Sequence, residues 1–137
     1  MGLSIYFEKV SHPRKRRKNE TLSNYLSDIS NKYDVTNVGY LRKVSSIYKY
    51  FSEKMEADKC IVKKEELTDI IDKATKVLSE RDAKTSEELL PIEIGFFFGT
   101  SSYDEYYYSC IRNTLFLFER MLSDWNDKDV LFISVSK

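Results

Sequence analysis

The sequence has few of the residues from which zinc sites are usually built, cysteine and histidine. Its 137 residues include two cysteines and one histidine. Cys60 and Cys110 form no CxxC motif, and with a single histidine they would need a carboxylate to complete a zinc site. We therefore interpret both thiols as small apolar side chains of a core. The sequence predicts no metal site and no cofactor.

Long apolar runs and an excess of charge of one sign are also missing. No run approaches the roughly 20 apolar residues that a membrane-spanning helix needs. The first ten residues alternate and include Glu8, unlike the apolar block of a signal peptide. With so little cysteine, this predicts a cytoplasmic protein without a membrane segment. Basic and acidic residues both number 22, so the whole protein has no net attraction for nucleic acid or anionic membranes.

Local signatures of catalysis are absent. The motifs of phosphate-binding loops, serine hydrolases and zinc peptidases (G-x-x-x-x-G-K, G-x-S-x-G and H-E-x-x-H) do not occur. His12 stands beside Pro13 with no serine or cysteine motif nearby, and the carboxylates form no D-x-D or E-x-x-H pattern. Because no nucleophile and base are paired, we predict that the protein is not an enzyme.

What the sequence does contain is a globular composition rich in aromatic residues. Hydrophobic residues make up 42% and charged residues 32%, which fits a single domain over residues 1–137. Aromatic residues reach 14%, with ten tyrosines and eight phenylalanines. This content predicts either an aromatic core or an aromatic binding surface.

Hydrophobic periodicity predicts four strands and four helices. The expected strands cover residues 3–10, 59–63, 92–98 and 130–135. The expected helices cover residues 20–30, 38–55, 64–80, and a stretch from a Ser102–Glu105 capping box to about Asp124. Residues 11–19 are expected to form a flexible basic loop, and residues 81–88 a loop or short turn.

The element order β-α-α-β-α-β-α-β predicts an α+β fold. Four strands covered by helices on one face would form a two-layer sandwich. The helices are long enough to cross over between parallel strands, so we predict a mixed four-stranded sheet with three main helices and one short helix.

The segment Gly95 to Arg112, GFFFGTSSYDEYYYSCIR, is the strongest candidate for a binding function. Gly95 within a strand suggests a bulge or a close backbone approach, and Gly99 suits a turn with positive φ. The amide groups at the start of the following helix could bind an anion. Asp104 and Glu105 in that first turn would repel it, so we prefer a well-capped helix to a phosphate site.

Four tyrosines, at positions 103, 106, 107 and 108, spread over both sides of the first turns of this helix. At most two of them can belong to the core. The others favour recognition by stacking or protein contact, and the alternative is a core rim with the hydroxyls in water.

Two clusters of basic residues are further candidates. Arg42 and Lys43 could pair with Asp104 or Glu105, or they could hold an anionic ligand. A second cluster could contact phosphates, although a solvated loop is the preferred interpretation. It consists of Arg14, Lys15, Arg16, Arg17 and Lys18. The complete candidate binding site comprises Tyr40, Arg42, Lys43, Phe97, Tyr103, Asp104, Glu105, Tyr106 and Tyr107.

Three stretches resemble an uncharacterised family of small phage, prophage and bacterial proteins. MGLSIYFEKV is similar to the family's MGLD-[IM]-Y-[FL] opening. VGYLRKVSSIYKYF resembles V-G-Y-W-R-K-x-N-x-[IL]-H-x-[FW]-F, and LLPIEIGFFFGTSSYDEYYYSCIRNT resembles LLPT-x-x-GFFFG-x-x-x-YDEYY-x-x-[DV]-[IL]-x-x-T. The resemblance covers most of the chain, and its last block is specific. It implies a phage-associated accessory protein that opposes host defence.

The chain departs from the family pattern at four positions. Ser4 replaces an acidic residue and Leu41 replaces tryptophan. Ser45 and Tyr48 stand where asparagine and histidine are usual, so any reaction that these residues served in relatives is not expected here.

We therefore expect a binding protein that inhibits a host protein, antiviral or regulatory, through an aromatic and charged surface. One alternative is a small-ligand or nucleotide binder with Arg42 and Lys43 as anion contacts and Phe97 or Tyr107 as stacking platforms. Another is a nucleic-acid binder through residues 14–18. A homo-oligomer is compatible with all three.

Overall fold

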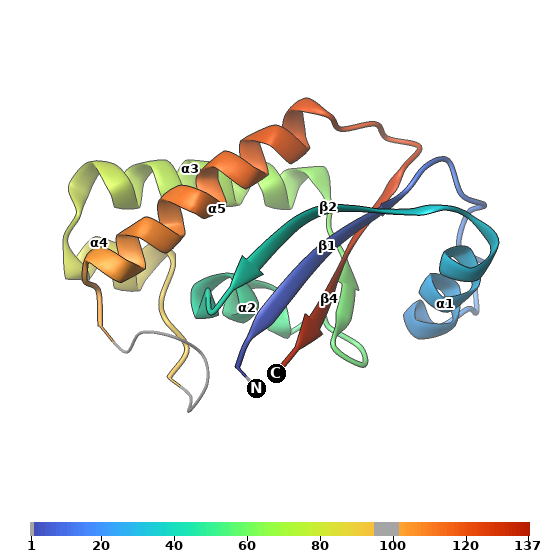
Figure 1. Ribbon diagram of the computed structural model, residues 1–137, viewed down its shortest axis with the longest axis horizontal. Coiled ribbons are helices and arrows are strands. Elements are labelled where there is room, and N and C mark those ends of the chain that lie inside the picture. The colour runs from blue at the N-terminus through green and yellow to red at the C-terminus, as the bar shows by residue number, and fades with distance from the viewer. Residues whose placement is uncertain (1, 95–101) are drawn as a thin grey trace.

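The computed structural model describes residues 2–94 and 102–137, and they form an α+β fold with a four-stranded sheet, as predicted (Figure 1). The strands are β1 (Ser4–Val10), β2 (Val35–Arg42), β3 (Lys59–Ile61) and β4 (Val130–Ser136). The helices are α1 (Leu22–Lys32), α2 (Ser45–Ser52), α3 (Lys64–Glu80), α4 (Ala83–Leu89) and α5 (Glu105–Ser123).

The sheet has the strand order β2-β1-β4-β3, and every neighbouring pair is antiparallel. The prediction of a mixed sheet is therefore wrong. The order along the chain also differs from the predicted one. A strand, β2, lies between α1 and α2, and three consecutive helices, α3, α4 and α5, lie between β3 and β4. In the pairing of β1 with β2 the register shifts between Phe7 and Glu8, so that Val38 is an extra residue in β2.

The predicted helix over residues 38–55 is wrong in its first part, where the chain forms the end of β2. Gly39 lies in this part of β2 and faces α5. A Cβ atom on Gly39 would lie 2.6 Å from Leu117 Cδ1, so β2 approaches α5 more closely than any other residue type would permit. Lys43 then adopts a φ of 60°, which ends the strand and leaves only Ser45–Ser52 for the helix.

Two other predictions near residue 90 differ from the structure where it describes the chain. Residues 81–88, predicted as a loop or short turn, contain most of helix α4, which Asp82 caps by accepting a hydrogen bond from Thr85 N at 2.6 Å. Within the predicted strand 92–98, residues 92–94 lie outside the sheet, and residues 95–98 lie outside the described residues. Ile94 is 84% exposed, so its alternation with Ile92 does not mark a buried face.

The start of α5 also differs from the predicted Ser102–Glu105 capping box. Asp104 is the N-cap residue, and its side chain accepts a hydrogen bond from Tyr107 N at 3.0 Å. The Ser102 hydroxyl donates to the Asp104 carboxylate at 3.0 Å and so supports the cap instead of forming it.

Helix α5 covers one face of the sheet and α3 packs along α5 (Figure 1). The rings of Phe7 and Phe118 meet edge to face, with centroids 5.4 Å apart. Leu131, Phe132 and Ile133 are consecutive in β4 and all buried. Consecutive residues of a strand point to opposite faces of the sheet. At the start of β4, the sheet face that lies away from α5 is therefore covered as well.

Helix α1 lies at that end of the sheet and contributes buried side chains to the same core (Figure 1). The other half of the face that lies away from α5 is open. Tyr6 of β1 and Tyr40 of β2 are paired across it, are both exposed, and have ring centroids 5.1 Å apart.

Candidate functional site

A groove runs between the outer edge of β2 and helix α5, and we call it the β2–α5 groove. Its volume is about 530 Å³. From the strand side it is lined by Tyr40, Leu41, Arg42 and Val44. From the helix side it is lined by Tyr106, Ser109, Cys110, Asn113, Phe116, Leu117 and Arg120. The helix residues recur at intervals of three and four, so they form one stripe along α5.

Three large aromatic side chains in this groove are exposed to solvent. The exposed fraction is 45% for Tyr40, 48% for Tyr106 and 63% for Phe116. Several exposed aromatic residues along one groove are typical of a protein-binding surface, whereas single exposed apolar residues need no explanation.

Tyr40 is held in place by its neighbours on the open face of the sheet. Its ring lies against the ring of Tyr6, and its hydroxyl is 3.2 Å from the hydroxyl of Ser4. The hydrogen bond with Ser4, and a weaker one with Arg42, lower the pKa of Tyr40. A fixed ring loses little conformational entropy on binding, which favours its use as an anchor.

The charged residues that line the groove are both arginines, Arg42 and Arg120. Among residues 2–94 and 102–137, no ion pair involves either of them. The groove is therefore locally positive although the chain carries no net charge.

Three of the predicted site residues, Tyr40, Arg42 and Tyr106, meet in this groove. Lys43 borders a smaller depression beside it, together with Ile92 and Tyr107. Phe97, with the glycines and phenylalanines around it, lies outside the described residues.

Tyr107, predicted as a surface residue of the site, is instead buried together with Tyr108. The Tyr107 hydroxyl donates to the Leu90 carbonyl at 2.7 Å, and burial raises its pKa. The Tyr108 hydroxyl lies 3.1 Å from the buried Ser86 hydroxyl. Both rings belong to a second core between α3, α4 and α5, which agrees with the expectation that at most two of the four tyrosines are core residues.

Tyr103 and the first acidic residues of α5 have structural partners. The Tyr103 hydroxyl accepts a hydrogen bond from Ile92 N at 3.3 Å, and its ring meets that of Tyr107 edge to face. Asp104 caps the helix, as described above. Glu105 pairs with Arg81 at 3.2 Å, so the predicted pairing of Glu105 with Arg42 or Lys43 is wrong.

The basic segment at residues 14–18 is not a uniform row of free cations. Arg14 donates to Glu20 at 2.9 Å and to Asp28 at 2.8 Å, and its carbonyl accepts from the Tyr25 hydroxyl at 2.7 Å. Arg14 is thus held against helix α1 and Glu20 by hydrogen bonds. The other four residues of the segment are exposed: Lys15, Arg16, Arg17 and Lys18.

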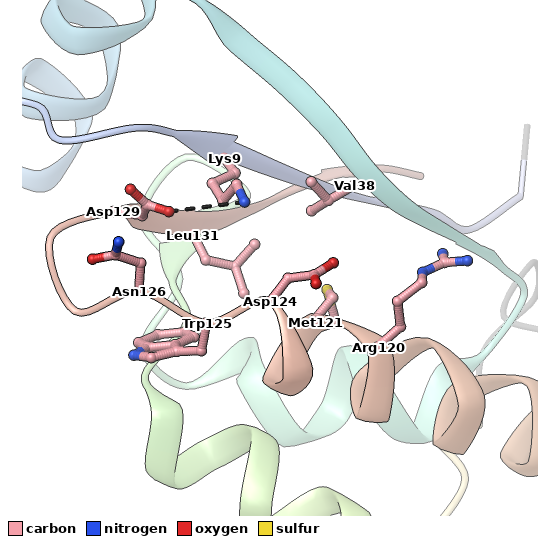
Figure 2. Close-up of a pocket in the computed structure, with 9 residues that line it drawn as sticks. All are labelled: Lys9, Val38, Arg120, Met121, Asp124, Trp125, Asn126, Asp129 and Leu131. Atoms are coloured by element: carbon pink, nitrogen blue, oxygen red, sulfur yellow. Dashed lines mark ion pairs between the residues drawn. The ribbon is translucent and has the colours of Figure 1, made fainter.

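A second hollow lies between the sheet and the end of α5 (Figure 2). Its volume is about 40 Å³, and on its sheet side Lys9 Nζ lies 3.8 Å from a carboxylate oxygen of Asp129. Arg120 and Asp124 add one further charge of each sign. A space of this size holds a few water molecules and is far smaller than a nucleotide site.

Sequence reasoning missed Phe116 and Arg120, which complete the groove. Phe116 lies off the apolar stripe of α5 that contains Ile111, Thr114 and Phe118. A large aromatic residue on the polar side of an amphipathic helix is the signal that would have found it.

Among residues 2–94 and 102–137, no three side chains of histidine, cysteine, aspartate or glutamate could together hold a metal ion. Within the same ranges, no helix is both long and apolar enough to cross a membrane. Comparison of the chain with family models, with curated proteins and with solved structures found no match.

Proposed function

We propose that this chain is a binding protein that captures another protein in the β2–α5 groove. In this proposal it is a phage-associated accessory protein that acts in the host cytoplasm and inhibits a host protein. The observation that carries the proposal is that three exposed aromatic residues, Tyr40, Tyr106 and Phe116, line one groove together with two arginines that have no acidic partner among the described residues. Aromatic and arginine anchors dominate the binding energy of protein interfaces.

The chemistry of the groove supports binding more than catalysis. Cys110 is the one nucleophilic thiol in the lining, and burial raises its pKa, which suppresses the reactive thiolate. Among the described residues of the lining, no histidine, aspartate or glutamate could act as a base beside it.

The alternative of a nucleotide site loses one of its stacking platforms. Tyr107 is buried beneath Tyr103 and Leu90, so its ring face is not available to a ligand. The groove itself is open and elongated, whereas small-molecule sites enclose most of the ligand.

The proposal is tested by affinity capture from a lysate of phage-infected bacteria, with the bound proteins, nucleic acids and small molecules identified by mass spectrometry. The double variant Tyr40→Ala/Phe116→Ala removes two exposed rings from the groove. Ile94→Ala, which removes an exposed side chain outside the groove, is the matched control.

We expect one host protein to be retained by the wild type and by Ile94→Ala and to be lost with the double variant. The proposal fails if all three baits retain the same set of proteins, or if the material that depends on the groove is a nucleotide or a nucleic acid.

A further inference from the structure

We infer that the β2–α5 groove binds an extended segment of its partner that carries acidic side chains, and that this segment joins the sheet as an additional strand beside β2. The inference rests on the proposed function and specifies how the partner is held. Three features carry it: the position of β2, the direction of its backbone groups and the charge of the groove.

Strand β2 is at the end of the sheet order β2-β1-β4-β3, and with eight residues it is longer than β3, the strand at the other end. The edge of a long terminal strand is a template for another strand unless it is covered or carries charges that prevent pairing. Here the edge borders a groove whose far wall is a helix, which is the setting in which domains add a peptide strand to their own sheet.

The hydrogen bonding between β1 and β2 shows which backbone groups face the groove. Lys43 N donates to the Leu3 carbonyl at 2.8 Å, one step beyond the pair formed by Ser4 and Arg42. In an antiparallel pair, alternate residues exchange hydrogen bonds with the neighbouring strand. Gly39 and Leu41 therefore bond toward β1, and Tyr40 and Arg42 direct their amide and carbonyl groups to the opposite side, along the outer edge.

Tyr40 and Arg42 thus present donor and acceptor groups at the two-residue repeat of an extended chain. The side chains of an added strand would alternate between two environments. One set would pack on the stripe of α5 that includes Tyr106 and Phe116, and the other would lie beside Tyr40 on the open face.

The positive charge of the groove indicates which kind of partner segment it binds. Arg42 and Arg120 line the groove without a carboxylate, so acidic side chains complement it. A second copy of the chain pairing along β2 would instead bring two positively charged grooves together, each lined by Arg42 and Arg120, and like charges at an interface disfavour association. A phosphate backbone would suit the arginines but not the edge carbonyl groups of Tyr40 and Arg42, which are hydrogen-bond acceptors.

The test uses an alternating Glu-Val octapeptide as a probe, with a Lys-Val octapeptide of the same pattern for comparison. Binding and amide hydrogen exchange are followed by NMR on the isotope-labelled full chain. We expect the Glu-Val peptide to bind and to slow exchange at the amides of Tyr40 and Arg42. The amides of Gly39 and Leu41 should change little, because they already bond to β1.

Charge-swapped variants give the second measurement. Arg42→Glu should lose affinity for the Glu-Val peptide and gain affinity for the Lys-Val peptide. Lys76→Glu makes the same kind of change on the exposed side of α3, away from the groove, and should behave as the wild type.

Each contrary result overturns a defined part of the inference. Binding that shifts Tyr106 and Phe116 but leaves exchange at Tyr40 and Arg42 unchanged rules out strand addition, while partner capture in the groove still stands. Equal binding of both peptides, or no binding of the Glu-Val peptide at millimolar concentration, rules out an acidic segment. Dimerisation through β2 in sedimentation, or displacement of the peptide by an oligouridine, would assign the groove to a second copy or to nucleic acid.

Discussion

The two sides of α5 use the same residue types in opposite ways. On the side that faces α3 and α4, Tyr107 and Tyr108 are buried and each hydroxyl has a hydrogen-bond partner within the fold. On the side that faces β2, the rings of Tyr106 and Phe116 remain exposed. The count of tyrosines therefore says little about function, and the informative difference is whether the fold itself uses each ring.

The cations show the same contrast. Arg14 is fully engaged by Glu20 and Asp28, whereas the ion pairs of the described residues include neither Arg42 nor Arg120. Substitutions in the engaged set are therefore expected to change stability, and substitutions of the exposed groove residues to change binding alone.

The largest effect is expected at Tyr107. Tyr107→Ala should lower the free energy of unfolding by about 3–5 kcal/mol, because it leaves a cavity between α3, α4 and α5. Tyr107→Phe keeps the ring but leaves the Leu90 carbonyl without its donor, and should cost about 1–3 kcal/mol. Denaturant unfolding followed by circular dichroism measures both free energies. If Tyr107→Ala lowers the free energy of unfolding by less than about 1 kcal/mol, the loss expected for the buried hydrogen bond alone, this ring does not belong to the core.

A somewhat smaller loss is expected for Gly39→Ala. The added methyl group would lie 2.6 Å from Leu117 Cδ1, so β2 and α5 must move apart or Leu117 must change its rotamer, at a cost of about 1–3 kcal/mol. Shortening Leu117 should relieve the clash. The double variant Gly39→Ala/Leu117→Ala is therefore expected to lose less stability than the two single losses added together. Additive losses would contradict the close approach.

A pH-dependent effect is expected at Glu20. Hydrogen bonds from Arg14 lower the pKa of Glu20 to about 2, below its ordinary value of 4.5. A carboxylate with a lowered pKa stabilises the fold above its unfolded pKa, and this contribution is lost as the pH falls from about 4.5 toward 2. Glu20→Gln should thus lose less stability on acidification than the wild type.

The measurement compares the urea midpoint at neutral pH and at about pH 3. Glu80→Gln, at the exposed end of α3, removes a carboxylate far from Arg14 and should retain the acid sensitivity of the wild type. Identical pH profiles for Glu20→Gln and the wild type would mean that the pair with Arg14 does not persist in solution.

The smallest effect on stability is expected in the groove. Phe116→Ala should change the free energy of unfolding by no more than about 0.5 kcal/mol, because its side chain is 63% exposed. The same variant should weaken partner capture. A large loss of stability would show that this ring belongs to the fold, and the contrast between the two sides of α5 would disappear.

The sequence predicts the fold best where periodicity is strong and local. Strand β1, helix α3 and strand β4 lie where alternation or helical spacing indicated them. Residues 38–55 mislead because Tyr40, Val44 and Ile47 have helical spacing, although a strand ends between them. The cause is tertiary: the close packing of Gly39 on Leu117 brings together residues far apart in the chain, and no local pattern records it.

The candidate site was predicted in part. Of the residues that the sequence proposes as a site, Tyr40, Arg42 and Tyr106 line the same groove. Tyr107 shares the spacing of Ile111, Thr114 and Phe118, which already indicated a buried position. Arg120 could not be assigned to the groove in advance, because its place depends on how α5 crosses β2.

The register shift beside Val38 sets a limit on what the edge of β2 can offer. Beyond this residue the alternation of inward and outward backbone groups changes phase, since Glu8 pairs with Asn37 and Phe7 with Gly39. A strand whose hydrogen bonds match Tyr40 and Arg42 therefore cannot also match residues 35–37 in the same register. The register shift thus limits pairing to short segments and disfavours the continuous edge-to-edge pairing of strands from which fibrils form.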